Sequence, residues 1–276
     1  MSRPALALVG LEADDLPDVQ AEVPAIAIAL DEAGITGLRY PVTIHLTNGT
    51  TQATVGKVSI AANVASGTRG VHMSRFVECL HAWHRQISVA TFADLLADIA
   101  ERSAATSVVA RLDFPIFLER SAPVSGNGAL VAYDCAIVGR LTEDGSSCEL
   151  ITRIPITSLC PCSREISDYG AHNQRGAIEA SVIINRTPEQ DLDFVDVIEL
   201  AGQSGSAPIY SLLKRTDERY VTMQAYENPA FVEDIARAVA VALQDDVRIV
   251  AGRIRVVNEE SIHAHDAYAA VNWTRT

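Results

Sequence analysis

A polar segment in the second half of the chain gathers side chains that bind metals or act as nucleophiles. Residues 157–176 read TSLCPCSREISDYGAHNQRG and join two stretches whose pattern predicts strands. Connections between strands are usually a few residues long, so one of this length is either functional or disordered. Cys160 and His172 are suitable ligands for zinc and similar ions. We therefore expect a functional site here.

The cysteine spacing distinguishes between kinds of metal site. Cys160 and Cys162 form a Cys-x-Cys pair, and the sequence has no second closely spaced pair. A structural zinc site usually draws four ligands from two such pairs, whereas a catalytic site keeps one position open for water. The pattern is therefore typical of an open site. Two ordinary thiols and a histidine that caps a turn would give the same pattern.

Two histidines near the end of the chain form a second group. His263 and His265 lie two apart in NEESIHAHDAY, so in an extended chain both rings point to the same side. Paired imidazoles can bind a metal or transfer protons near neutral pH. Structural histidines are the alternative reading.

Two carboxylates and two arginines complete the candidates that residue types suggest. Glu218 lies in KRTDERYV, and Glu233 lies one turn into a helix predicted to begin near Pro229. Both could instead be solvated helix carboxylates. Arg69 and Arg75 flank the start of the first predicted helix, where guanidinium groups and free N–H groups favour an anion. An ordinary capped helix start is the alternative.

The elements that must position these residues occur in two similar series. Residues 1–36 form an acidic, aperiodic arm with a short helix expected over 25–33. Each following half reads strand–strand–helix–helix–strand–strand, which defines a first module over 37–143 and a second over 144–276. The second carries most of the candidate site. The predicted strands are 40–47, 51–62, 107–119, 129–141, 149–157, 176–185, 247–257 and 267–274, and the predicted helices are 72–86, 91–104, 191–201 and 229–244.

The resulting fold class is α+β, with two tandem ββααββ units, each an antiparallel sheet carrying two helices on one face. Such a sheet leaves its other face and its edges to be covered, so oligomerisation is expected.

Composition limits the function classes. The chain has 22 basic and 35 acidic residues and a net charge of −13, which argues against a nucleic-acid partner. No stretch has the roughly 18 apolar residues of a membrane-spanning helix, and no leader pattern is present, so we expect a cytoplasmic protein without a membrane partner. Five cysteines, an odd number, argue against a disulfide framework.

Several of these segments together resemble one enzyme family, the type IB GTP cyclohydrolases. The resemblance rests on RGVHMSRF, TSLCPCSREISDYGAHNQRG, KRTDERYV with AYENPAFVED, and NEESIHAHDAYA, and it extends over most of residues 16–276. It implies a bimodular tunnelling fold assembled as a homotetramer. It also implies hydrolysis of GTP to 7,8-dihydroneopterin triphosphate and formate, the first step of folate biosynthesis, with zinc, manganese or ferrous iron as cofactor.

The resemblance implies metal and catalytic roles for five candidates. Cys160 and His172 resemble the metal ligands, with Glu218 as a further ligand in some states. Cys160, His263 and His265 resemble the catalytic groups, the two histidines as the acid–base pair. The expected chemistry is attack on C8 of guanine by a water that the metal activates, with a histidine protonating a ring nitrogen.

Further residues are implied to bind the substrate. Glu233 resembles the carboxylate that binds the purine, because guanine presents N1–H and an exocyclic amine side by side to a carboxylate. Arg69, Arg75 and Arg175 are the candidates for the triphosphate. Met223 departs from the family pattern, in which we expect a glutamate, and its effect is open.

Two other functions are alternatives at the level of sequence. A nitrile reductase of the same fold would use a cysteine and NADPH on a deazapurine nitrile. The chain has no stretch like that family's Glu-Ser-Lys-Ser motif, and Lys57 and Lys214 are its only lysines. A non-catalytic purine- or pterin-binding module is the second alternative, against which the retained cysteine and histidines argue.

Overall fold

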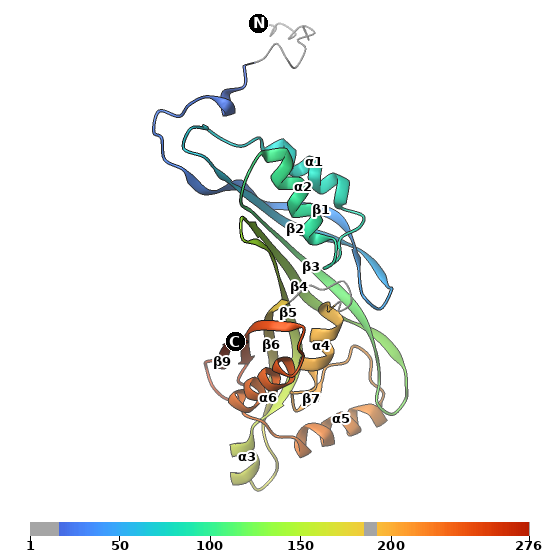
Figure 1. The fold of residues 1–276 in the computed structure, drawn as a ribbon. Coiled ribbons are helices and arrows are strands. Elements are labelled where there is room, and N and C mark those ends of the chain that lie inside the picture. Colours follow the sequence, from blue (N-terminus) through green and yellow to red (C-terminus); the bar gives the residue numbers. More distant parts are fainter. Residues whose placement is uncertain (1–16, 185–191, 276) are drawn as a thin grey trace, which may run out of the picture.

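The computed structural model describes residues 17–184 and 192–275 and consists of a long antiparallel sheet with helices packed against it (Figure 1). In this part of the chain the sheet has nine strands, and the order of the eight long ones is β1-β2-β3-β4-β5-β6-β8-β9. The short β7 pairs with β5. The strands are β1 Leu30–His45, β2 Thr51–Val64, β3 Val108–Ser121, β4 Gly128–Thr142, β5 Gly145–Leu159, β6 Asn173–Ile184, β7 Ala207–Pro208, β8 Ile249–Asn258 and β9 Ala267–Thr274.

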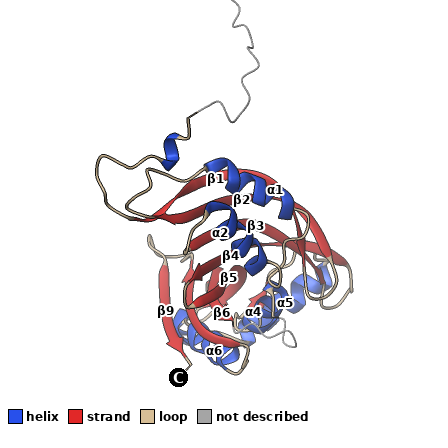
Figure 2. Cartoon of the chain, turned by 45° about the horizontal axis from the view of Figure 1, so that its top comes forward, coloured by secondary structure: helices blue, strands red, loops and turns tan. Residues whose placement is uncertain are grey.

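In each half of the chain, a set of helices connects the two middle strands. In the first half, α1 (Met73–Trp83) and α2 (Phe92–Ser103) connect β2 to β3, which are neighbours in the sheet. In the second half, α4 (Phe194–Gly202), α5 (Arg215–Glu227) and α6 (Val232–Gln244) occupy the corresponding connection from β6 to β8. A short α3 (Pro161–Ile166) lies between β5 and β6. Figure 2 shows the sheet curving from β1 to β9 with these helices beside it.

The strands follow from alternating side chains, and their turns from local chemistry. In β3 every second residue from Val108 is buried, as expected for a strand with one face on the core. The Asn48-Gly49 hairpin is confirmed: Gly49 has a φ of 80°, and the amide of Leu46 donates to the carbonyl of Thr50 at 3.0 Å. The two predicted modules meet at the tight turn between β4 and β5, whose ends Thr142 and Gly145 pair.

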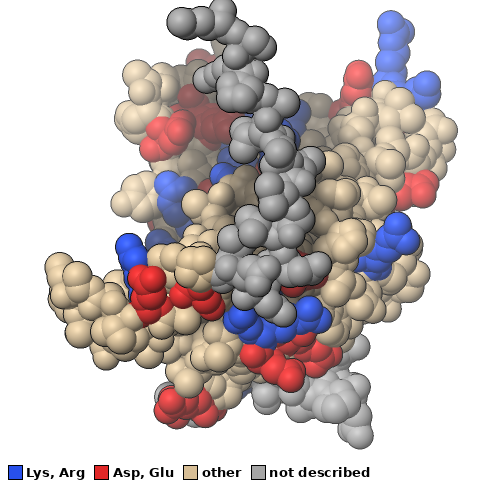
Figure 3. All heavy atoms as spheres, turned by 90° about the horizontal axis from the view of Figure 1, so that it is seen from above, with Lys and Arg blue, Asp and Glu red and all other residues tan. Residues whose placement is uncertain are grey.

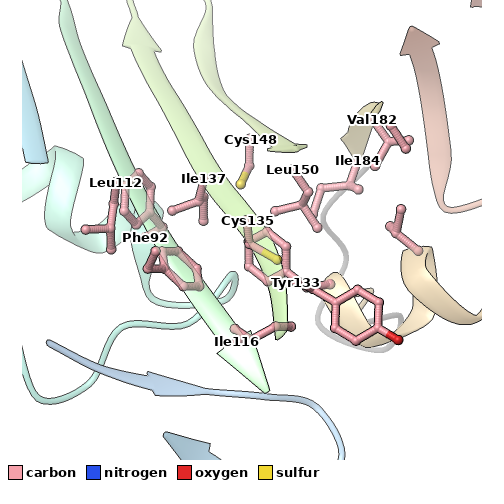
Figure 4. Packing of buried hydrophobic residues seen from close by; sticks show 14 of the residues in the cluster. Phe92, Leu112, Ile116, Tyr133, Cys135, Ile137, Cys148, Leu150, Val182 and Ile184 are labelled. Carbon is pink, nitrogen blue, oxygen red and sulfur yellow. The ribbon is translucent and has the colours of Figure 1, made fainter. Parts of the chain in front are cut away.

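The core lies between the sheet and the helices and continues across β3, β4, β5 and β6 (Figure 4). The stripe predicted for the second helix is buried as Phe92, Leu95, Leu96 and Ile99. Gly139 lets this helix approach β4, since a Cβ there would meet Phe92 and Leu96 at 2.7 Å. Burying each such side chain contributes about 1.5–3 kcal/mol, so the stripe holds the helix on the sheet.

Three sequence expectations are wrong, and each error has a local cause. The arm contains no helix over 25–33; β1 instead begins at Leu30 and extends the predicted strand backwards. The predicted loop over 157–176 is mostly ordered structure, because β5 continues to Leu159, β6 begins at Asn173 and α3 fills the gap. The second half also gains α5, whose largely polar surface gave no apolar stripe to detect. The start of the helix predicted over 191–201 lies outside the described residues at position 191.

None of the helices in the described ranges combines the length and the apolar character that crossing a membrane requires. On the face seen from the α1 end, basic and acidic side chains lie in small adjacent groups (Figure 3). Among the ion pairs of the described residues, Arg69 and Glu22 lie 2.9 Å apart.

Candidate active site

Cys160 and His172 face each other where the β5–β6 hairpin ends. The last regular pair of this ladder joins Leu159 and Asn173, and the amide of Cys160 then donates to the carbonyl of His172 at 3.1 Å. Residues directly opposite on antiparallel strands project their side chains on the same face, with Cβ atoms about 4.5–5.5 Å apart. The hairpin therefore makes neighbours of the two residues predicted as metal ligands.

Ser163 holds the segment between these two residues in a compact turn. Its hydroxyl donates to the carbonyl of Cys160 at 3.1 Å and accepts from the amide of His172 at 3.2 Å. Cys160 is the N-cap of α3, with Pro161 as the first helical residue, and its Sγ accepts from the amide of Ser163 at 3.5 Å. Cys160 stays partly exposed and Cys162 is exposed.

The ring of His172 is fixed by a chain of hydrogen bonds that reaches the β8–β9 connection. Its Nδ1 lies 2.9 Å from Oε1 of Gln174 and 3.2 Å from the hydroxyl of Ser261. The amide of Gln174 donates in turn to Glu260 at 3.1 Å. Within the described residues no hydrogen bond engages Nε2 of His172, so that nitrogen is available to a ligand.

His263 and His265 lie together, although not for the predicted reason. Residues 259–266 form a bent connection, so the extended chain in which both rings would share one side is not present. Their rings nevertheless stack, with centroids 5.2 Å apart and planes 20° from parallel. Both are exposed, and Ser261 in the same connection bonds His172. The connection thus ties the histidine pair to the Cys160–His172 hairpin.

The start of α6, which carries Glu233, is bound directly to the end of β5. The amide of Ala230 donates to the carbonyl of Leu159 at 3.1 Å, and the carbonyl of Ala230 accepts from the hydroxyl of Ser158 at 3.2 Å. The buried side chain of Asn258 donates to the same hydroxyl at 2.9 Å. The ends of β5, α6 and β8 therefore meet next to Cys160. The helix begins at Val232 rather than near Pro229, so the exposed Glu233 is in its first turn.

A buried carboxylate positions the helix that bears Glu218. Asp217, the preceding residue, is completely buried, and it binds the β3–β4 turn of the first half. Burial raises the pKa of this carboxyl, but hydrogen bonds lower it more, so its pKa lies well below the ordinary range. The donors are the amides of Val124, Ser125 and Lys214 and the hydroxyl of Ser125. Glu218 itself is exposed in the first turn of α5.

The predicted triphosphate arginines are not brought together in one chain. Arg175 lies at the start of β6 with an exposed side chain, near the candidate site. Arg69 and Arg75 lie around the start of α1, at the opposite end of the molecule from α3 (Figure 1). There Arg69 pairs with Glu22 at 2.9 Å, and Nη1 of Arg75 donates to the carbonyl of Arg102 at 2.8 Å.

The side chains fit a metal in part. A thiol and an imidazole with a free Nε2 are donors that suit zinc and related ions. Among the described residues, however, no group of three or more Cys, His, Asp or Glu side chains is arranged to hold an ion, so Glu218 does not join Cys160 and His172 in this arrangement.

Sequence reasoning missed the residues that support the site. Ser158, Gln174, Asp217 and Asn258 bind partners far away in the chain, and Ser163 bonds Cys160 and His172 across its own turn; no local period marks any of them. Only the position of Gln174, two residues after His172 and therefore on the same face of the strand, was a usable signal.

Solved structures with the same architecture place the chain in the class of tunnelling-fold proteins. A uricase from Arthrobacter globiformis aligns over 89% of this chain and 93% of its own, with a TM-score of 0.54 and 11% identity. A uricase from Bacillus fastidious aligns over 89% and 93%, with a TM-score of 0.51 and 8% identity. At such identities the likeness is one of fold alone.

Sequence comparison then gives the family. The model of type I GTP cyclohydrolase folE2 matches residues 16–269, and the chain belongs to this family. GTP cyclohydrolase FolE2 of Azoarcus sp. (strain BH72) is 40% identical over 257 residues, which cover 93% of this chain and 94% of the relative. The FolE2 proteins of Nitrosococcus oceani and Nitrosomonas eutropha are 41% and 42% identical, over 93% of this chain and 94% and 95% of theirs.

Proposed function

We propose that this chain is a GTP cyclohydrolase that converts GTP and water to 7,8-dihydroneopterin triphosphate and formate, the first step of folate biosynthesis. The observation that carries the proposal is that Cys160 lies opposite His172 at one hairpin end, and that the connection bearing His263 and His265 bonds His172 through Ser261, in a chain of the folE2 family. The alternatives of a nitrile reductase and of a non-catalytic module have no such support.

Glu233 is proposed to bind the guanine. Its carboxylate is exposed in the first turn of α6, where a ligand can reach it. An ionised carboxylate accepts from N1–H and the exocyclic amine of guanine together, and this bidentate contact discriminates against adenine, which lacks both donors in that arrangement. The hydrogen bonds of Ala230 with Ser158 and Leu159 join the segment before α6 to the end of β5, directly before Cys160.

His263 and His265 are proposed to move the protons of the hydrolysis. Addition of water to C8 and cleavage of the bond from C8 to the ring nitrogen require one proton to leave the water and one to reach the nitrogen. A second hydrolysis then releases formate, and rearrangement of the ribose closes the pterin ring. Two stacked, exposed imidazoles next to the hairpin can divide the roles of base and acid between them.

Cys160 and His172 are proposed to hold a divalent ion, with Glu218 as a further ligand. Zinc, manganese and ferrous iron are the candidates, and the bound ion would make water acidic enough to attack at neutral pH. In this proposal Glu218 approaches through a shift of α5, because the described residues do not group it with the other two.

The protein is proposed to act as a homotetramer. In the described residues β1 and β9 are the edges of the sheet, each with one neighbouring strand, and such edges favour pairing with another copy. A neighbouring copy would also bring Arg69 and Arg75 near Arg175 to bind the triphosphate. A cytoplasmic location stays a prediction, with which the odd number of cysteines, five, agrees.

The test is to incubate metal-stripped protein with GTP and then add manganese, ferrous iron or zinc, following formate and the fluorescence of oxidised neopterin. We expect metal-restored production of both. A folded oligomer that releases no formate with any of the three ions contradicts the proposal, and turnover of a deazapurine nitrile with NADPH would replace it. Light scattering of the same sample tests the tetramer.

A further inference from the structure

The side chain of Gln174 connects His172 to Glu260 in a single line of hydrogen bonds. Oε1 of Gln174 lies 2.9 Å from Nδ1 of His172, and Nε2 of Gln174 lies 3.1 Å from a carboxylate oxygen of Glu260. Gln174 is only 8% exposed, and its backbone is held in the ladder opposite Ser158. The amide therefore bridges two partners from a rigid position.

The chemistry of the three groups fixes the direction of the line. An ionised carboxylate can only accept hydrogen bonds, so the NH₂ of Gln174 must face Glu260. The carbonyl oxygen of Gln174 must then face His172, and because that oxygen only accepts, Nδ1 of His172 must carry the proton. The hydroxyl of Ser261, 3.2 Å from the same nitrogen, can accept from it as well. The lone pair of the neutral ring is consequently left on Nε2.

We propose that Gln174 is a positioning residue that, oriented by Glu260, keeps His172 in the Nδ1–H tautomer and thereby presents Nε2 to the metal beside Cys160. This inference rests on the proposed function, in which His172 is a ligand. An outer partner on the second ring nitrogen fixes ring orientation, and losing one typically lowers metal affinity about 10–100-fold.

The experiment compares variants of the full-length, metal-free protein. Gln174→Met keeps the length of the side chain and removes both the donor and the acceptor. The double variant Gln174→Glu, Glu260→Gln exchanges the two groups. It keeps a hydrogen-bond acceptor facing Nδ1 of His172, because the new carboxylate accepts from both His172 and the new amide. Gln52→Met is the matched control, because Gln52 bonds the backbone of Phe117 in the first half.

Two measurements separate the inference from the function on which it rests. Nitrogen NMR of labelled histidine, at a pH where the ring is neutral, reports the tautomer, and chelator competition with zinc or manganese alone reports affinity. We expect Gln174→Met to lose the Nδ1–H tautomer and about 10–100-fold in affinity. The exchanged pair and Gln52→Met should keep both.

An unchanged tautomer in a folded Gln174→Met protein overturns the inference. If the tautomer changes but the affinity for zinc or manganese does not, Nε2 of His172 does not bind the metal, and His172 is removed from the proposed ligands. Failure of the wild-type protein to turn over GTP contradicts the cyclohydrolase proposal alone, because neither measurement uses GTP.

Discussion

Two regions of the molecule gather polar side chains beside a helix: the start of α1 in the first half and the end of the β5–β6 hairpin in the second. The partners of these side chains differ between the two regions. Around α1 the polar side chains pair within the chain: Arg69 forms an ion pair with Glu22, and Nε2 of His72 lies 3.2 Å from a carboxylate oxygen of Asp18. At the hairpin end the hydrogen bonds come from backbone groups, Ser163 and Gln174; Sγ of Cys160 accepts only a long one, 3.5 Å from the amide of Ser163, and no hydrogen bond among the described residues engages Nε2 of His172.

The difference teaches how a protein keeps reactive atoms available. Ion pairs between exposed side chains occupy the very charges that a ligand would use, and they contribute little stability. Neutral hydrogen bonds to the backbone and to the far side of a ring fix position without occupying the functional atom. A ligand could therefore bind at the hairpin end directly. To bind a ligand, Arg69 must first give up its ion pair with the carboxylate of Glu22.

The largest expected effect comes from removing the thiol of Cys160 or the imidazole of His172. Cys160→Ala and His172→Ala should each lose bound metal, measured by elemental analysis, and lower turnover by more than about a hundredfold, since a catalytic ion supplies several kcal/mol. Cys79→Ala is the control. Burial, with Asp98 nearby, raises the pKa of its thiol to about 11, and we expect full activity and a loss of about 1 kcal/mol of stability. Full turnover in either site variant means that the assigned site is wrong.

The next effect concerns two adjacent carboxylates of α6. Glu233→Gln should raise the KM for GTP about 10–100-fold, because a charge-assisted contact worth about 1.5–3 kcal/mol is lost. Asp234→Asn is the matched control, since Asp234 bonds the amide of Phe231 and the side chain of Arg237 at the helix start. It should cost about 1 kcal/mol of stability and leave KM unchanged. Equal KM effects would contradict the purine role.

A smaller effect tests the link between the two halves through Asp217. Its depressed pKa means that the ionised carboxylate stabilises the fold above the ordinary Asp pKa of about 3.9, and that this contribution is lost as the pH falls toward the lower folded value. Asp217→Asn should therefore lower the urea midpoint at neutral pH. The difference in urea midpoint between this variant and the wild-type protein should become smaller as the pH falls.

The control for Asp217 is Asp94→Asn, an exposed carboxylate in the first turn of α2. It should shift the urea midpoint little at any pH. If the difference in urea midpoint between Asp217→Asn and the wild-type protein does not change with pH, the negative charge of Asp217 does not contribute to stability.

The smallest effect concerns the ion pair beside α1. The side chains of Arg69 and Glu22 are 55% and 53% exposed, so the pair contributes less than about 1 kcal/mol. If Arg69 binds the triphosphate, Arg69→Ala should raise the KM for GTP several-fold at low salt and less at high salt. Glu22→Gln should lower KM slightly by freeing the guanidinium. Unchanged KM in both would leave Arg69 as a structural contact of the arm.

The sequence by itself determined the element order of the first half and the antiparallel α+β class, and it supplied the residues that are proposed for the site. Hydrophobic periods and the Asn48-Gly49 turn are local signals, so they predict local structure well. The site residues stood out because Cys, His and Arg cluster in segments otherwise too long and polar for a connection.

Only the tertiary structure decided which of these residues meet. The end of the β5–β6 ladder places Cys160 opposite His172, and the bent connection between β8 and β9 stacks His263 on His265. The helix α5 has no apolar stripe to predict it, and its Asp217 is bound to the β3–β4 turn of the other half. These features depend on contacts between residues distant in the chain, and no period along the sequence encodes such contacts.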